Sequence, residues 1–95
     1  MFVVIGVWAL DPALEEVRRA VFDDLVAGVG QAHGIVRAYW AQDADDPTRS
    51  HTFIVFTDRE SAESFAADVR ANSENQARAG VTPVSLDLAE VSATT

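Results

Sequence analysis

The chain has 95 residues, of which 48% are hydrophobic and 23% are charged, and its formal net charge is −8. This length and composition predict one globular domain spanning residues 1–95. Only seven basic residues stand against fifteen acidic ones. That balance argues against nucleic acid and against an anionic membrane as partners, because both need clustered positive charge. Without cysteine, the chain has no disulfide and no thiolate metal site.

The first half of the chain predicts a strand, a helix and a second strand. Residues 2–9 are apolar at both alternating sets of positions, which indicates a strand with both faces buried. This run is too short for a signal sequence or a membrane span, so we expect a cytoplasmic protein. Asp11 and Pro12 suit a helix start. Residues 35–42 read as a more polar strand at a sheet edge. The helix between the two strands carries one apolar stripe, formed by Leu14, Val17, Val21, Phe22, Leu25 and Val29.

The second half repeats this order of elements. Residues 43–50 form an acidic hairpin loop, which lacks the glycine and the downstream glutamate of a calcium loop, so we expect no metal. Residues 51–56 are again apolar on both faces. Residues 57–60 match a capping box at the start of the second helix, and the last strand lies within residues 81–91.

This pattern predicts an α+β fold of the ferredoxin-like βαββαβ type, with a four-stranded antiparallel sheet in the order 4-1-3-2. The first and third strands are then central, and they are the two strands that are apolar on both faces. Two helices cover only one face of the sheet, and an exposed apolar face of this size is rare in a monomer. We therefore expect a homodimer formed through the open sheet face. The alternative is a monomer whose loop or short C-terminal tail covers that face.

Several segments together resemble the dimeric α/β-barrel superfamily, and within it the small antibiotic-biosynthesis-monooxygenase-like proteins. The resemblance covers almost the whole chain, and its clearest segments are residues 34–40, 46–47, 53–56 and 59–65. It implies the ferredoxin-like fold and the dimer. It implies less about chemistry, because members of the family include cofactor-independent oxygenases of small aromatic or polyketide-like compounds, haem-degrading enzymes and proteins of no known activity. The family's Glu-x-Trp pattern is absent at residues 55–58, and its second-helix histidine is absent at residues 66–69, so haem degradation is disfavoured.

The two histidines are the candidate general bases, because histidine is the side chain that most often moves a proton near neutral pH. His33 lies in a glycine-flanked turn, and His51 opens the third strand. They share no spacing typical of metal ligands. For each, the alternative interpretation is a solvated histidine at the end of an element.

The aromatic residues of the strands are the candidate ligand contacts. Tyr39 and Trp40 are neighbours on one strand and must point to opposite faces. Either could stack on an aromatic compound, and Tyr39 is also a candidate catalytic hydroxyl. Arg37 shares the face of Tyr39 and could bind an anionic oxygen, or it could pair with an acid across the sheet or the dimer. The full set of candidate ligand-binding residues is Trp8, Arg37, Trp40, Phe65 and Asn72.

Two functions follow from these observations. The first is a cofactor-independent monooxygenase in which the substrate supplies the electrons and the protein orients or deprotonates it. The second is a non-catalytic dimer that binds a small apolar molecule. The sequence leaves open whether the pocket lies on the helix side or on the dimer side of the sheet. The first function requires the candidate residues to surround one closed pocket.

Overall fold

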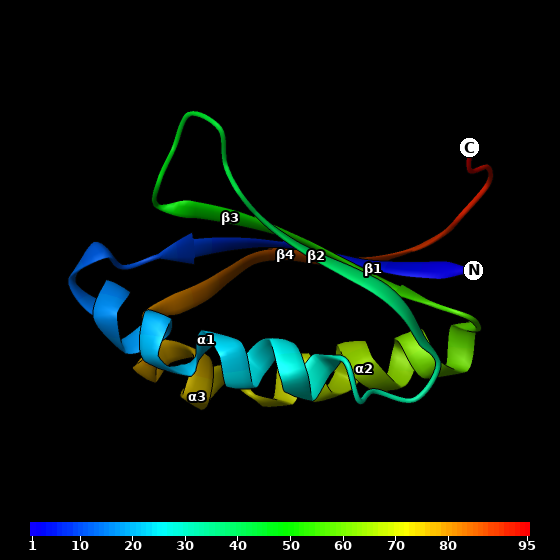
Figure 1. Cartoon of the computed structure of the whole chain (residues 1–95), viewed down its shortest axis with the longest axis horizontal. Helices are drawn as coiled ribbons and strands as arrows, with labels where there is room; N and C mark the ends of the chain where they lie inside the picture. The colour runs from blue at the N-terminus through cyan, green and yellow to red at the C-terminus, as the bar shows by residue number, and fades with distance from the viewer.

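The computed structural model describes residues 1–95 and contains one four-stranded antiparallel sheet with its helices on one side (Figure 1). The strand order is β2-β3-β1-β4, which confirms the predicted order 4-1-3-2. No helix is both long enough and apolar enough to cross a membrane. In chain order the elements are β1 (Phe2–Leu10), the 3₁₀ helix η1 (Pro12–Leu14), α1 (Glu15–Val29), β2 (Ile35–Gln42), β3 (Arg49–Phe56), α2 (Arg59–Ala71), α3 (Ser73–Arg78) and β4 (Val81–Glu90).

Aspartates cap the starts of the helical segments. The carboxylate of Asp11 accepts a hydrogen bond from the Ala13 N–H at 3.0 Å and begins η1, which continues into α1. The carboxylate of Asp58 accepts from the Ser61 N–H at 2.8 Å and begins α2. The predicted capping box, which starts at Thr57, is therefore wrong by one residue. Asp58 takes the cap position because its carboxylate binds both the N–H and the hydroxyl of Ser61.

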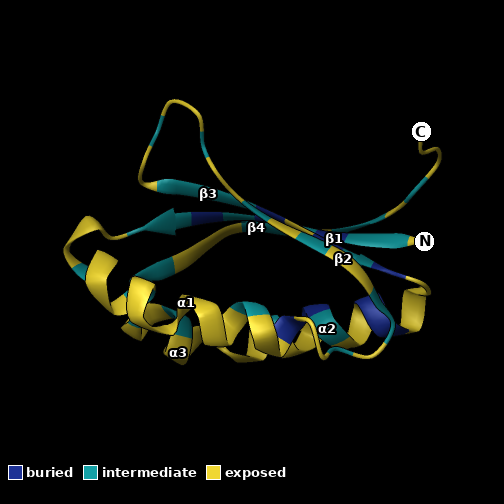
Figure 2. Cartoon of the chain, viewed as in Figure 1, coloured by how far each residue is buried: buried dark blue, intermediate teal, exposed yellow.

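The core lies between the sheet and α2. Its fully buried side chains include Val4 of β1 and Phe56 of β3, which are 1% and 0% exposed. Ala62 and Ala66 of α2 are also buried, because their small side chains let this helix approach the sheet closely. Figure 2 shows buried residues along α2 and on the strands above it.

The other face of the sheet, which we call the open face, has no helix over it (Figure 1). Val3, Ile5, Phe53 and Val55 lie on this face, in cross-strand pairs between β1 and β3. Phe53 is 39% exposed although it lies on a central strand. The two central strands are thus apolar on both faces, as the sequence predicts. The β2–β3 hairpin and the last residues of the chain both rise on this side of the sheet.

Helix α1 is packed differently from α2. Only Val29, at its C-terminal end, is buried. Val17, Val21, Phe22 and Leu25, which form most of its apolar stripe, are 46%, 48%, 42% and 50% exposed. Figure 2 shows α1 as a mostly exposed helix. The predicted apolar stripe is present on α1, but no other part of the chain covers most of it.

Candidate functional site

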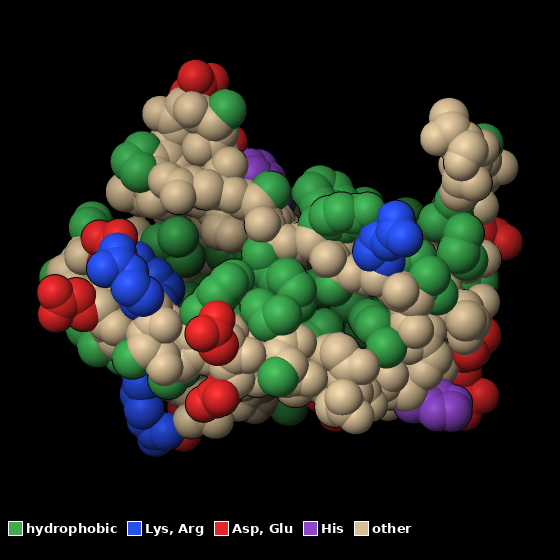
Figure 3. All heavy atoms as spheres, viewed as in Figure 1, with side chains coloured by type: hydrophobic (Ala, Val, Ile, Leu, Met, Phe, Trp, Pro, Cys, Tyr) green, Lys and Arg blue, Asp and Glu red, His purple; other side chains and the backbone are tan.

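The uncovered stripe of α1 borders an apolar hollow on the helix side of the sheet. Figure 3 shows hydrophobic side chains gathered in this hollow, between the strands and the helix that runs below them. We call it the α1 cleft and define it by its exposed α1 side chains and by the strand residue that contacts one of them, Phe22. These are Val17, Val21, Phe22 and Leu25 of α1 and Trp40 of β2.

The aromatic contact of the α1 cleft joins the helix to the sheet. The rings of Phe22 and Trp40 meet edge to face, with their centroids 6.1 Å apart and their planes at 81°. This is a favourable geometry for two aromatic rings. Phe22 is nevertheless 42% exposed, and Trp40 is only partly buried. Both rings therefore keep apolar surface that a flat molecule could cover.

A hydrogen bond between two buried side chains lies on the same side of the sheet. Thr52 of β3 pairs in register with Trp40 and with Gly6. The indole N–H of Trp8 donates to the Thr52 hydroxyl oxygen at 3.0 Å. A side chain at Gly6 would clash here, because its Cβ would lie 2.6 Å from both Thr52 Oγ1 and Trp8 Nε1. Glycine at this position lets the Trp8 ring lie over the strand and reach Thr52.

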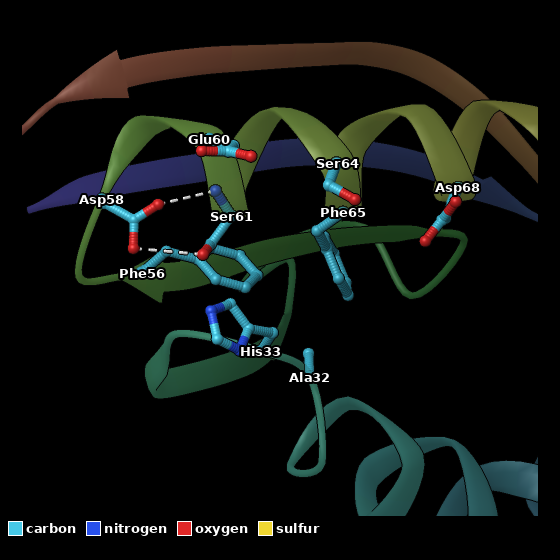
Figure 4. A pocket seen from close by; sticks show the side chains of 9 residues that line it. All are labelled: Ala32, His33, Phe56, Asp58, Glu60, Ser61, Ser64, Phe65 and Asp68. Carbon is cyan, nitrogen blue, oxygen red and sulfur yellow. Dashed lines mark hydrogen bonds between the residues drawn. The ribbon is translucent and has the colours of Figure 1, made fainter.

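A second pocket, which we call the helix-end pocket, lies between the start of α2 and the turn before β2 (Figure 4). Its volume is about 470 Å³. His33 enters it from the turn, with its ring near Phe56 and Ser61. The pocket is lined by Ala32, His33, Phe56, Asp58, Glu60, Ser61, Ser64, Phe65 and Asp68. With three carboxylates on its wall, it suits a cation or water better than an electron-rich aromatic anion.

Asp58 is fixed in its ionised form in this pocket. The backbone N–H of Ser61 is the main cause that lowers the pKa of Asp58, and the hydroxyls of Thr57 and Ser61 lower it further. A carboxylate held in this way caps a helix and is poorly suited to exchange a proton near neutral pH. Phe65 packs its ring on Phe56, with the centroids 5.1 Å apart, and is partly buried.

A third pocket, of about 300 Å³, lies between the end of α2, α3 and β4. Trp8 forms part of its wall, together with Val69, Gln76 and Leu86. Asn72 lies at the C-terminal end of α2, where its side-chain oxygen accepts from the Asn75 amide at 2.7 Å. Asn72 therefore organises the junction of α2 and α3, and it does not line this pocket.

The remaining candidate residues lie on the open face. Arg37 Nη1 donates to the Tyr39 hydroxyl at 3.3 Å, and both side chains are exposed. His51 Nε2 lies 2.8 Å from Asp43 Oδ1, and both side chains are about 30% exposed. This contact is the main cause that lowers the pKa of Asp43, and the N–H groups of Asp45 and Asp46 add to it. A carboxylate in this position orients an imidazole, as general bases often require.

The structure thus distributes the predicted site residues over several places. Trp8 and Trp40 lie on the helix side, and Arg37, Tyr39 and His51 lie on the open face. His33 and Phe65 belong to the helix-end pocket, and Asn72 belongs to a helix junction. The candidate residues do not surround one closed pocket, so a monooxygenase that uses all of them at a single site is not what the structure holds, and any catalytic site must be built from fewer of them. No group of three or more His, Asp or Glu side chains is placed to hold a metal ion.

Sequence reasoning did not assign Phe22 or Thr52 to a site. Phe22 is one of six apolar residues in a regular helical stripe. Its spacing is the same as that of a residue buried in the core, so the sequence gives no sign that it is exposed. Thr52 does carry a signal, because it is a hydroxyl residue whose next neighbours on the helix side of the strand, Ile54 and Phe56, are apolar and buried. A polar residue at such a position needs a hydrogen-bond partner, and Trp8 provides it.

The fold and the site define a ferredoxin-like α+β domain with one tightly packed helix, one loosely packed helix and an apolar open face. No protein-family model and no curated protein sequence matches the chain. Solved structures do match it over nearly its full length, and these are antibiotic-biosynthesis-monooxygenase-like proteins. The chain has their fold.

Three of these structures illustrate the likeness. A candidate antibiotic biosynthesis monooxygenase from Deinococcus radiodurans has a TM-score of 0.81 and 12% identity, over 100% of this chain and 96% of that one. SnoaB, a cofactor-independent oxygenase from Streptomyces nogalater, has a TM-score of 0.74 and 20% identity, over 98% and 94%. A candidate antibiotic biosynthesis monooxygenase from Nitrosomonas europaea has a TM-score of 0.72 and 19% identity, over 98% and 100%.

Proposed function

We propose that this protein is a cofactor-independent monooxygenase-like protein that binds a small aromatic or polyketide-like compound in the α1 cleft. One observation carries the proposal: four apolar side chains of α1 are 42–50% exposed, and one of them, Phe22, lies edge to face with the partly buried ring of Trp40. A bound aromatic molecule would remove this surface from water, and each Å² of apolar surface removed contributes about 25 cal/mol. The likeness to SnoaB, a cofactor-independent oxygenase, supports the same class of protein.

The chemistry of the proposed reaction needs little from the protein. An aromatic substrate with an acidic C–H bond loses a proton to water, and the resulting carbanion transfers electrons to O₂, which binds to the same carbon and takes up a proton to give a hydroperoxide. One oxygen atom is incorporated as a carbonyl, and the other leaves as water. A bound substrate would displace water from the apolar surface of the cleft. The Thr52 hydroxyl already accepts from Trp8, so its own hydrogen could be donated to an oxygen of the substrate.

A second function is supported by a different observation. The side chains that could move a proton, His33, His51 and Tyr39, lie outside the α1 cleft, in the helix-end pocket or on the open face. A protein that binds an apolar ligand without converting it needs none of them there. The alternative proposal is therefore a non-catalytic dimeric protein that binds small molecules in the same cleft.

The homodimer is part of both proposals. Val3, Ile5, Val7, Phe53 and Val55 form an apolar patch at the centre of the open face. Water contact with such a patch is unfavourable, and a second copy of the sheet would cover it with the same kind of surface. Native mass spectrometry tests this directly. A species of twice the 10.2 kDa chain mass supports the dimer, and a monomer at micromolar concentration contradicts it.

Anthrone is a suitable probe for the cleft, because it is flat and its CH₂ group is acidified by the neighbouring carbonyl. Oxidation consumes one O₂ and gives anthraquinone and one water. We expect anaerobic binding to quench tryptophan fluorescence, and aerobic incubation to consume O₂ and form anthraquinone in equal amounts. Anthraquinone is formed slowly without protein, so a protein-free sample is the baseline.

Variants locate the site. Phe22→Ala should weaken anthrone binding about tenfold, since it removes one of the two aromatic contacts. Val84→Ala is the control, because Val84 is a 52% exposed apolar residue on β4, at the sheet edge opposite β2, where it lines the third pocket instead of the cleft. Equal weakening by both variants would contradict the α1 cleft as the site. Tight binding without O₂ uptake above the baseline would favour the non-catalytic alternative.

A further inference from the structure

We propose that two copies of this chain pair face to face about a two-fold axis parallel to the strands, with Arg37 of each copy bound to Asp87 of the partner subunit. The inference rests on the proposed homodimer and adds its symmetry and its specific contacts. It starts from the charges on the open face.

Two charged residues of the open face lie away from the acidic hairpin and have no ionic partner within the chain. His51 is paired with Asp43, and Arg49 lies beside Asp46 at the hairpin. Arg37 and Asp87 take part in none of the ion pairs of the chain. Both are exposed. Each is therefore available to a group outside the chain.

The two residues lie at opposite edges of the sheet. Arg37 belongs to the edge strand β2 and Asp87 to the other edge strand, β4. Three interstrand steps of about 4.8 Å separate these strands, so the residues are about 14 Å apart and cannot meet in one chain. Between them lies the apolar centre of the open face. A positive edge, an apolar centre and a negative edge form a surface that can complement a second copy of itself.

The register places Arg37 and Asp87 in adjacent rows of the sheet, two residues apart along the strands. Tyr39 pairs with Phe53, Phe53 with Ile5, and Ile5 with Asp87, so these residues form one row across the sheet. Arg37 lies two residues from Tyr39, and its guanidinium donates to the Tyr39 hydroxyl. This hydrogen bond holds the positive charge near the row that ends in Asp87.

Symmetry then determines which edges meet. A two-fold axis parallel to the strands, above the midline between β3 and β1, stacks β2 of one copy over β4 of the other. It also places Phe53 over Ile5 of the partner subunit. Sheets packed face to face lie about 10 Å apart, which a long Arg and a short Asp side chain together can span. An axis across the strands would instead stack β2 on β2 and leave both charges without a partner at that edge.

Charge reversal provides the test. Arg37→Glu would place a second carboxylate against Asp87 of the partner subunit, twice in each dimer. Asp87→Arg would place two guanidinium groups together, also twice. Each variant alone should weaken dimerisation about 100-fold, because each of the two symmetric contacts contributes a factor of about ten. Mixing the two variants should restore a dimer, because each contact in the mixed species again joins opposite charges. The double variant should dimerise by itself for the same reason.

Native mass spectrometry distinguishes the mixed dimer from either parent by mass, and circular dichroism shows that the variants are folded. Asp24→Arg is the control for the change in net charge, because Asp24 is exposed on α1, on the other side of the sheet. Single variants that stay dimeric, or a mixture that stays monomeric, would overturn the ion pairs while leaving the dimer intact. A monomeric wild type would instead overturn the dimer itself.

Discussion

The two long helices of this domain cover the same side of one sheet, but they pack against it in different ways. Helix α2 presents Ala62 and Ala66 to the sheet, and both are buried against Val4 and Phe56. Helix α1 presents Phe22 and other large side chains that remain about half exposed. The small residues allow α2 to close on the sheet, whereas α1 leaves its large apolar side chains uncovered. One half of the helix side is therefore a dry core, and the other half is a cleft.

The largest expected effect is the difference in stability lost when one aromatic ring is truncated in each half of the helix side. Phe56→Ala removes a side chain with no exposure and should cost about 3–5 kcal/mol of the free energy of unfolding. Phe22→Ala removes a ring that is 42% exposed and should cost less than about 1 kcal/mol. Urea denaturation followed by circular dichroism measures both. Similar losses for the two variants would mean that α1 is packed as tightly as α2.

A smaller effect is expected at Gly6, on the helix side of the central strand β1. Gly6→Ala would place a Cβ 2.6 Å from Thr52 Oγ1 and Trp8 Nε1 and push the Trp8 ring away. Such overpacking costs about 1–3 kcal/mol. The fluorescence spectrum should shift to longer wavelength as the Trp8 ring meets water. Trp40→Phe in the same background isolates the Trp8 signal, and an unchanged spectrum in that background would refute the expected displacement.

The smallest effect concerns the cap that starts α2. Hydrogen bonds from Ser61 and Thr57 lower the pKa of Asp58, so its stabilising contribution is complete above the unfolded pKa of about 3.9. That contribution disappears as the pH falls through the lower pKa of the folded state. Asp58→Ala should therefore reduce the melting temperature by several degrees at pH 7, and the difference from wild type should shrink toward pH 2. A difference independent of pH would show that the ionised carboxylate is not what stabilises the start of the closely packed helix.

The strand order of the sheet could be predicted from the sequence, because the alternation of apolar residues that marks a central strand is visible within each strand. Val3 and Ile5 alternate with Val4, and Phe53 and Val55 alternate with Ile54, so two strands apolar on both faces could be recognised and placed at the centre. The same logic failed for the helices, because an apolar stripe looks identical whether the chain covers it or not. The difference lay in side-chain size: alanines at positions 62 and 66 allow close approach, whereas Phe22 and Leu25 do not.

The candidate site was less predictable for a related reason. Sequence alone placed Tyr39 and Trp40 on opposite faces, and the register confirms this, with Trp40 beside Thr52 and Tyr39 beside Phe53. It could not tell which face held which ring. Nor could it show that His33 and His51 end up in different environments, because that depends on where the turn before β2 and the hairpin fold back in space.

The position of β1 in the sheet also has a consequence for how the chain acquires its structure. The first strand of the chain is central, and one of its two neighbours is the last strand, with Phe2 paired to Glu90. Contacts between such distant segments form slowly, because a long loop must close before they can stabilise anything. On the ribosome, β1 must wait for nearly the whole chain to emerge before β4 can pair with it. Its apolar residues remain exposed during that time, so synthesis is the stage at which this domain is most prone to aggregate.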